Sequence, residues 1–182
     1  MTDKTNAPFQ LEEATIADLL ATFDIGPMRT LQQDVEFGVL QIVDIALKAI
    51  SPAVNDPSTA ISCIDQLSRV MIRWISRREP DRSLFDPPHV ERVAIPWVTL
   101  DELLDTAFEQ IRHYATGDLA VSLRLLRALG DIAATTASAK IKASLLTRAE
   151  VVVEGCRDRL GAAASGRLEA RLALLRADAS GG

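Results

Sequence analysis

Residues 30–60 read TLQQDVEFGVLQIVDIALKAISPAVNDPSTA, and this stretch decides the fold because it spans one helix and the start of the next. Thr30 can cap the first helix, with Gln33 at the reciprocal capping-box position three residues later. Ser51 precedes Pro52, and proline disfavours the helical conformation in the residue before it. The stretch therefore predicts a helix that begins after Thr30 and ends before the proline.

The second half of the same stretch contains a helix start. In Asn55-Asp56-Pro57, Asp56 fits the N-cap, and Pro57 fits the first helical position, where a backbone N–H is not needed. Glu79-Pro80 stops this second helix. Apolar residues recur along one face of it at helical spacing: Ala60, Ile64, Leu67, Met71, Trp74 and Ile75.

The remainder of the chain is mainly helical, with one exception. Residues 82–97 contain RSLF and VERVAI on the two sides of the turn Asp86-Pro87-Pro88, and the β-branched residues of the second segment indicate a short strand. This favours a small β-hairpin or an irregular insertion. Thr99 with Glu102 forms a further capping box. Asp118 fits the N-cap of a helix whose leucines cover more than one face, as expected of a central helix. A long apolar stripe follows from 139 to 160, and a short amphipathic helix ends the pattern.

These elements indicate a mainly α protein, a single helical bundle-like domain of about six helices. We expect residues 1–10 to form a flexible arm, residues 11–177 the helical domain and residues 178–182 a disordered tail, with a linker at 161–166 before the last helix. The chain is 48% hydrophobic but only 4% aromatic, which favours helices that pack through small and aliphatic side chains.

Charge and hydropathy exclude some partners and locations. The net charge of −5 argues against a nucleic-acid partner, because clustered Lys and Arg drive phosphate binding. The sequence has no run of about 18 apolar residues, and MTDKTNAPFQ at the N-terminus lacks the features of a secretory signal. Cys63 and Cys156 lie in separate helical patterns, so buried, reduced thiols are expected. The sequence thus predicts a soluble, cytoplasmic domain.

A polar strip runs along the first helix of the opening stretch. At about 100° per residue, its polar side chains fall within an arc of roughly 100°, and apolar residues fill the opposite arc. The strip either faces water, with Asp44 and Lys48 as an i, i+4 pair, or lines a polar cleft together with Arg29 and the loop 51–59. Its members are Thr30, Gln33, Asp34, Gln41, Asp44, Lys48 and Ser51.

The loop before the second helix has a similar ambiguity. Free N–H groups at a helix start, beside the hydroxyls of Ser58 and Thr59, can hold an anion. Asp56 would occupy those N–H groups, which favours a structural cap. A ligand bound here would then be a neutral or cationic group, or a metal bridged through Asp56 and Asp44.

Other chemistry is sparsely represented. Asp105, Glu109 and His113 share one ridge, but no second helix offers matching ligands, so we expect a solvated face and predict no metal site. No GxSxG, GxGxxG, P-loop or HExxH motif occurs, and the cofactor is left unknown. The second helix also has a basic edge, which consists of Arg69, Arg73, Arg77 and Arg78. Because Asp65 and Glu79 flank it, we interpret it as a solvated or ion-pairing face in preference to a phosphate-binding track.

The residues around the first helix also form one continuous motif. Arg29-Thr-Leu-Gln-Gln-Asp, then Phe37-Gly and QIVDIALKAISPAVNDPSTA from Gln41, is similar to the RTxxQDxxFGxxQLVDIALRALSPxINDPxTA pattern of bacterial predicted membrane proteins called domain of unknown function 2254. The likeness covers roughly residues 20–135 and implies no established activity. It implies a membrane domain as neighbour or partner, because family members usually carry several transmembrane helices before this region. The matching residues are Arg29, Gln33, Asp34, Gln41, Asp44, Asn55, Asp56 and Thr59.

Three kinds of function stay open. The first is a non-enzymatic binding or regulatory module, whose candidate ligand residues are the eight motif residues and Lys48. The second is an enzyme or metal site that uses Asp44 or Asp56 in a polar cleft. The third is a purely structural or oligomerisation domain, and a homo-oligomer is expected because the helices offer more apolar surface than one small bundle hides.

Overall fold

Two antiparallel helices, α2 (Val35–Ile50) and α3 (Pro57–Ile75), follow from the opening stretch. The computed structural model describes residues 13–22, 26, 30, 34–77, 81–86 and 89–180, and these contain seven helices and two strands, so the mainly α prediction is confirmed. The remaining elements are α1 (Glu13–Ala21), β1 (Ser83–Asp86), β2 (Val90–Ala94), α4 (Leu100–Tyr114), α5 (Leu119–Ala133), α6 (Ala139–Cys156) and α7 (Ala162–Ser180).

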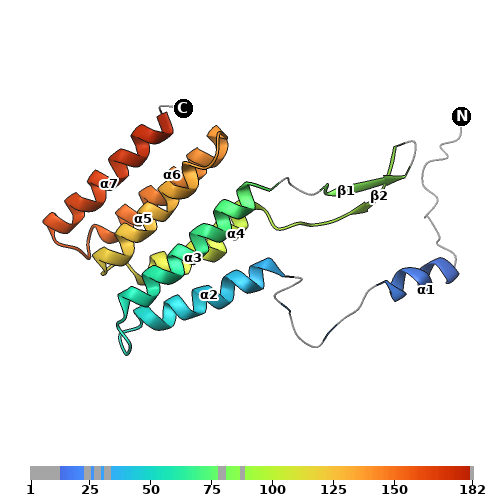
Figure 1. Ribbon diagram of the computed structural model, residues 1–182, viewed down its shortest axis with the longest axis horizontal. Coiled ribbons are helices and arrows are strands. Elements are labelled where there is room, and N and C mark those ends of the chain that lie inside the picture. Colours follow the sequence, from blue (N-terminus) through green and yellow to red (C-terminus); the bar gives the residue numbers. More distant parts are fainter. Residues whose placement is uncertain are drawn as a thin grey trace, which may run out of the picture.

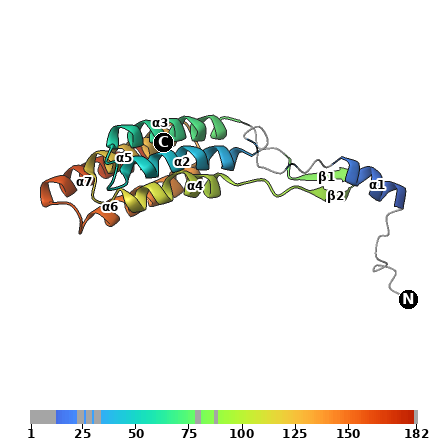
Figure 2. The same ribbon diagram turned by 90° about the horizontal axis from the view of Figure 1, so that it is seen from below.

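Helices α2 to α7 lie side by side as a bundle, with α5 inside it (Figures 1 and 2). On one side α5 packs against α3, and on the other it packs against α6 and α7, while α2 lies against α3 and α4. The leucines of α5 cover more than one face, so it buries side chains toward both halves of the bundle. The predicted central position of this helix is confirmed.

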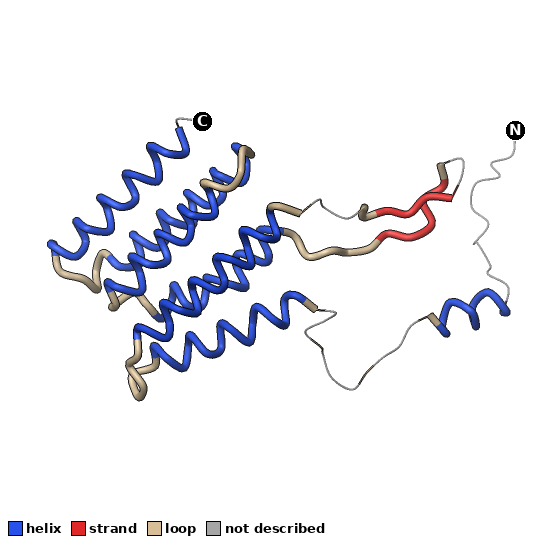
Figure 3. Tube along the Cα trace, in the orientation of Figure 1, coloured by secondary structure: helices blue, strands red, loops and turns tan. Residues whose placement is uncertain are grey.

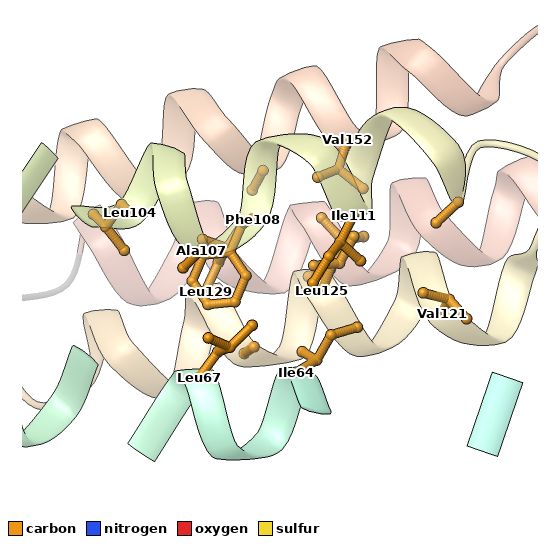
Figure 4. Packing of buried hydrophobic residues seen from close by; sticks show 14 of the residues in the cluster. Ile64, Leu67, Leu104, Ala107, Phe108, Ile111, Val121, Leu125, Leu129 and Val152 are labelled. Atoms are coloured by element: carbon orange, nitrogen blue, oxygen red, sulfur yellow. The ribbon is translucent and has the colours of Figure 1, made fainter. Parts of the chain in front are cut away.

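The core is a single cluster of aliphatic side chains with one ring, Phe108. Figure 4 shows Ile64 of α3, Phe108 of α4 and Leu125 of α5 converging between the helices, with Val152 of α6 on the far side. Full burial of such a side chain stabilises the fold by about 1.5–3 kcal/mol. The buried residues recur every three to four positions, which is why helical spacing in the sequence located them.

The predicted cap of α2 is wrong. The helix begins at Val35 and its N-cap is Asp34, whose Oδ1 accepts a hydrogen bond from the backbone N of Phe37 at 2.9 Å. Thr30 therefore lies outside the helix. A carboxylate satisfies an N-terminal N–H as a hydroxyl does, and its negative charge also interacts favourably with the positive end of the helix dipole.

The expected linker and tail near the C-terminus are partly helical. Helix α7 begins at Ala162, directly after Gly161, and extends to Ser180, so residues 178–180 are not part of a disordered tail. Alanine-rich residues at its start favour the helix, and Leu168, Leu172 and Leu175 are buried against its neighbours. The expected flexible arm at 1–10 lies outside the described residues.

The predicted hairpin is confirmed, and it lies apart from the bundle. Strands β1 and β2 pair antiparallel with each other and with no other described strand. Figures 1 and 3 show the hairpin beyond the ends of α3 and α4, away from the core. Neither the hairpin nor α1 packs against another described element. Both elements therefore keep their apolar side chains largely exposed.

Candidate functional site

The described part of the polar strip on α2 faces solvent. Gln41, Asp44 and Lys48 are exposed, and Asp34 is half-buried as the N-cap. Ile45, which the sequence placed on the buried arc, is 51% exposed beside them. Helix α2 packs only against α3 and α4, so it buries the narrower face formed by Val39, Val43, Ala46 and Ala49. Arg29 and Gln33 lie outside the described residues.

Hydrogen bonds within the loop between α2 and α3, and from the loop to both helices, hold it in place. Asp56 is the N-cap of α3: Oδ1 accepts from the backbone N of Thr59 at 3.1 Å, and Oδ2 accepts from Thr59 Oγ1 at 2.6 Å. These bonds hold the pKa of the Asp56 carboxyl below its usual value. The backbone N of Asp56 also donates to Ala49 O at 2.8 Å, which ties the loop to α2. The carboxylate thus occupies the groups that an anion would need.

Asn55 has an unusual backbone conformation in this loop. Its φ is 47°, in the left-handed region that asparagine tolerates better than most residues. Its side chain is exposed. The structure therefore brings Asn55, Asp56 and Thr59 together as a helix-to-helix connection, while their assignment as ligand residues stays a prediction.

A cavity of about 260 Å³ lies elsewhere, between α4, α5 and α6. We call it the α4–α6 groove. Its floor is apolar, and Figure 4 shows several of the floor residues in the packed interior. The floor consists of Leu104, Phe108, Leu125, Leu129 and Val152, and the rim of Asp105, Glu109, Arg112, Thr147, Arg148 and Val151.

The charged side chains on the rim are held in pairs. Arg148 Nη2 lies 2.8 Å from Asp105 Oδ1, and Arg112 Nε donates to Glu109 Oε2 at 2.9 Å. The hydrogen bond from Arg112 lowers the pKa of Glu109 and, in return, raises the pKa of Arg112. The rim carries two positive and two negative charges, so the entrance of the groove is electrically neutral overall.

The expected acidic ridge is divided between these pairs. Asp105 and Glu109 each contact an arginine, and the His113 ring lies edge-on to Tyr114 with centroids 5.3 Å apart. In the described part of the chain, no three His, Cys, Asp or Glu side chains are grouped to hold a metal. Asp105 and Glu109 line the groove, whereas His113 lies outside its lining.

The sequence predicted the acidic ridge on α4 but not the α4–α6 groove beside it. Arg148 is 43 residues from Asp105, so a scan along one helix does not find the pair. One signal was available: Ser144 and Arg148 repeat the i, i+4 spacing of Asp101 and Asp105. Ser144 Oγ indeed donates to Asp101 Oδ1 at 2.6 Å, and this bond, with the nearby Arg148, lowers the Asp101 pKa.

A second depression, of about 450 Å³, lies where α4 and α6 begin. Arg82 and Lys140 line it, but Asp101 lies beside them and Thr99 with Glu102 closes the start of α4 in the predicted capping box. The pKa of Asp101 is lowered mainly by the hydrogen bond from Ser144 and least by Lys140, and the pKa of Glu102 is lowered mainly by the hydrogen bonds from Thr99 and least by Arg82. Its positive and negative charges therefore offset one another.

Comparison with known proteins gives the family. The family described as predicted membrane protein, domain of unknown function 2254, matches residues 3–131. The chain belongs to this family. The match ends within α5, so α6 and α7 lie beyond it. Within the described residues, no helix is both long and apolar enough to cross a bilayer.

Mycobacterial proteins are similar to this chain. Uncharacterised proteins of Mycobacterium bovis and Mycobacterium tuberculosis are 37% identical to it over 129 residues, which is 71% of this chain. The chain spans only about a quarter of the length of these relatives, since the match covers 25% of each. No solved structure matches the chain significantly.

Proposed function

We propose that the chain is a non-enzymatic binding domain of this membrane-protein family, in which the α4–α6 groove takes a small, mainly apolar ligand without net charge. The observation that carries the proposal is the groove itself, which combines an apolar floor with a rim of four ionised groups in two pairs. Pockets for small ligands typically combine an apolar lining with a few polar groups that fix orientation.

The volume of the groove limits the size of the ligand. An apolar cavity of about 150 Å³ holds a benzene molecule, so a cavity of about 260 Å³ suits a substituted ring or a short hydrocarbon chain. A charged ligand would have to compete with an arginine or a carboxylate that already has its partner, so it would gain only the difference between two partly exposed ion pairs. A neutral ligand disturbs neither pair and gains from contact with the floor.

The lowered pKa values of four carboxyls favour binding over catalysis. The pKa is lowered at the carboxyls of Asp56, Asp101, Glu102 and Glu109, which keeps them ionised at neutral pH. A carboxyl that serves as a general acid near neutral pH needs a raised pKa instead. Asp56 and Glu102 accept hydrogen bonds within helix N-terminal caps, and Asp101 and Glu109 accept them from Ser144 and Arg112, which is a structural use of the charge.

Helix α6 forms one side of the groove but lies outside the family match. The family match contains α4 and most of α5, whereas α6 lies beyond it and supplies Thr147, Arg148, Val151 and Val152 to the groove. The groove is thus completed by a helix that the family pattern does not include. We attribute ligand choice to α6 and attachment to a larger membrane protein to the family region.

The test is a thermal-shift titration of the chain with butylbenzene and with hexanol as neutral apolar probes. At a probe concentration of 100 times its dissociation constant, binding stabilises the fold by about 2.7 kcal/mol, a clear rise in the unfolding temperature. Val151→Trp places a large ring over the groove, because Val151 is 43% exposed on its rim.

The matched control is Leu174→Trp, which adds the same ring at a 57% exposed leucine on α7 outside the groove. Stabilisation by a probe that is lost in Val151→Trp and kept in Leu174→Trp supports the groove. If neither probe raises the unfolding temperature, or both variants respond alike, the groove is not a binding site.

A further inference from the structure

Three exposed arginines follow one another along α3 and just past its end. Arg69 and Arg73 are four residues apart on the helix, so their Cα atoms lie about 6 Å apart along its axis, and Arg77 follows two residues after the last helical residue, Ile75. We call them the α3 arginine ridge. Residues 66–77 contain no Asp or Glu, and within the described chain none of the three arginines has a carboxylate partner.

Tertiary packing explains why Arg69, the first arginine of the ridge, has no partner on its own helix. Asp65 lies one helical turn before Arg69, where an i, i+4 ion pair would be expected. Its carboxylate instead contacts the guanidinium of Arg124 on α5, with the two side chains 33% and 23% exposed. The acid one helical turn before Arg69 is therefore used to join α3 to α5.

The hairpin that follows α3 carries an apolar face. Leu84 pairs with Val93 across the two strands, so their side chains lie on the same face. Val90 and Val93 are three residues apart and would point to opposite faces of a regular strand. A bulge between Leu84 and Phe85 shifts the register and places Val90 on the same face as Val93. Leu84, Val90 and Val93 are 52%, 52% and 47% exposed. An isolated two-stranded hairpin is marginally stable in water. A surface that covers its apolar face would therefore stabilise the hairpin.

Aromatic side chains lie at the same end of the molecule. Phe85 is 62% exposed on the hairpin, and Trp97 is 42% exposed just after it. Figures 1 and 3 show the hairpin extending from the end of the bundle where α3 finishes, which is the end where the arginine ridge stops. Basic, aliphatic and aromatic side chains are thus grouped at one end of the folded molecule.

We infer that this end docks on an anionic membrane surface. The α3 arginine ridge contacts lipid phosphates, while the hairpin face and Trp97 enter the headgroup region, which is where Trp is enriched in membrane proteins. The chain has a net charge of −5, so attraction to anionic lipid must come from the local ridge and not from overall charge. The family is described as predicted membrane proteins, which is consistent with a bilayer as the partner of this surface.

Membrane docking is separate from the proposed function, because the α4–α6 groove takes no part in the contact with lipid. The test is co-sedimentation of the chain with vesicles of neutral phosphatidylcholine alone or mixed with phosphatidylserine. Binding is expected only with the anionic vesicles and weakens as salt rises. The triple variant Arg69→Gln, Arg73→Gln, Arg77→Gln is expected to lower the partition constant on the order of 100-fold, given the contribution of each basic residue near an anionic surface.

A matched triple variant controls for net charge. Arg127→Gln, Arg159→Gln and Arg167→Gln remove three exposed arginines elsewhere on the bundle and should leave binding nearly unchanged. Leu84→Ser with Val93→Ser should also weaken binding while keeping its salt dependence. Equal binding to neutral and anionic vesicles, no binding to either, or equal losses in the two arginine triples would overturn the inference.

Discussion

Arg148 on α6 and Asp105 on α4 form an ion pair across the groove, with 2.8 Å between Nη2 and Oδ1. Arg148 also reaches Asp101 Oδ1 at 3.2 Å, and its own side chain is only 23% exposed. One arginine thus holds together the two helices that form the walls of the groove. Its position makes the width of the groove depend on charge as well as on apolar packing.

Replacement of Arg148 should therefore destabilise the chain. We expect Arg148→Ala to lower the free energy of unfolding by about 1–2 kcal/mol, because several partly exposed ionic and hydrogen-bonding contacts are lost together. Urea denaturation measures the change. Arg157→Ala is the control, since Arg157 and Glu154 are 56% and 67% exposed, and its loss should stay below about 0.5 kcal/mol. Equal effects of the two variants would contradict this role for Arg148.

The loop residue Asn55 should be replaceable by glycine but not by alanine. Its φ of 47° suits Gly, whereas a Cβ without a polar group is disfavoured there. Asn55→Ala should cost about 1 kcal/mol in the free energy of unfolding, and Asn55→Gly should change it by less than about 0.5 kcal/mol. A urea series on both variants decides the point. A loss in Asn55→Gly as large as in Asn55→Ala would show that the amide, and not the backbone, matters.

Stability should fall in acid. The pKa is lowered at the carboxyls of Asp56, Asp101, Glu102 and Glu109 relative to ordinary values of 3.8 for Asp and 4.5 for Glu. A lowered folded-state pKa gives stability that is fully present above the ordinary value and is lost as pH falls through the folded-state value. The urea midpoint should therefore be steady from pH 7 to about 5 and then decline.

Glu109 allows a direct check of this pH dependence. Glu109→Gln removes the ionisable partner of Arg112, so it should lower stability at pH 7 and reduce the further loss in acid. Glu169→Gln, at an exposed position on α7, should leave the acid decline as it is in the native chain. If Glu109→Gln declines with acid as steeply as the native chain, the pair does not contribute.

The exposed position of Asp44 gives a prediction for the strip on α2. Asp44→Ala should change the free energy of unfolding by less than about 0.5 kcal/mol, as surface substitutions usually do. The same variant should keep any stabilisation by butylbenzene, because Asp44 is not in the groove. A folded Asp44→Ala that loses the response to a ligand would instead make the α2 strip the site, as the motif predicts.

The helices were largely predictable because their signals are local. Asp56 with Pro57, Thr99 with Glu102, and Asp118 each mark a start that the structure confirms. A cap needs only a side-chain acceptor within three residues of a free N–H, so the sequence contains the whole interaction. The start of α2 was mistaken because two acceptors, Thr30 and Asp34, compete within one turn.

The groove was not predictable, and neither was the absence of carboxylate partners along the arginine ridge, for the opposite reason. Both depend on pairs distant in sequence: Arg148 with Asp105, and Arg124 with Asp65. Nothing within a single helix indicates which arginine a carboxylate will contact when several are available. Ile45 shows the same limit, since helical spacing marks an apolar arc but not how many neighbours will cover it.

The sequence by itself determined the helical class, the hairpin, most helix starts and membership of the family, because caps, prolines and the periodicity of apolar residues act over a few residues. The tertiary structure alone decided which faces are covered and which charges are paired. Packing of α5 between the two halves of the bundle brings α6 to α4 and Arg124 to Asp65. Those contacts form the groove and leave the α3 arginine ridge exposed.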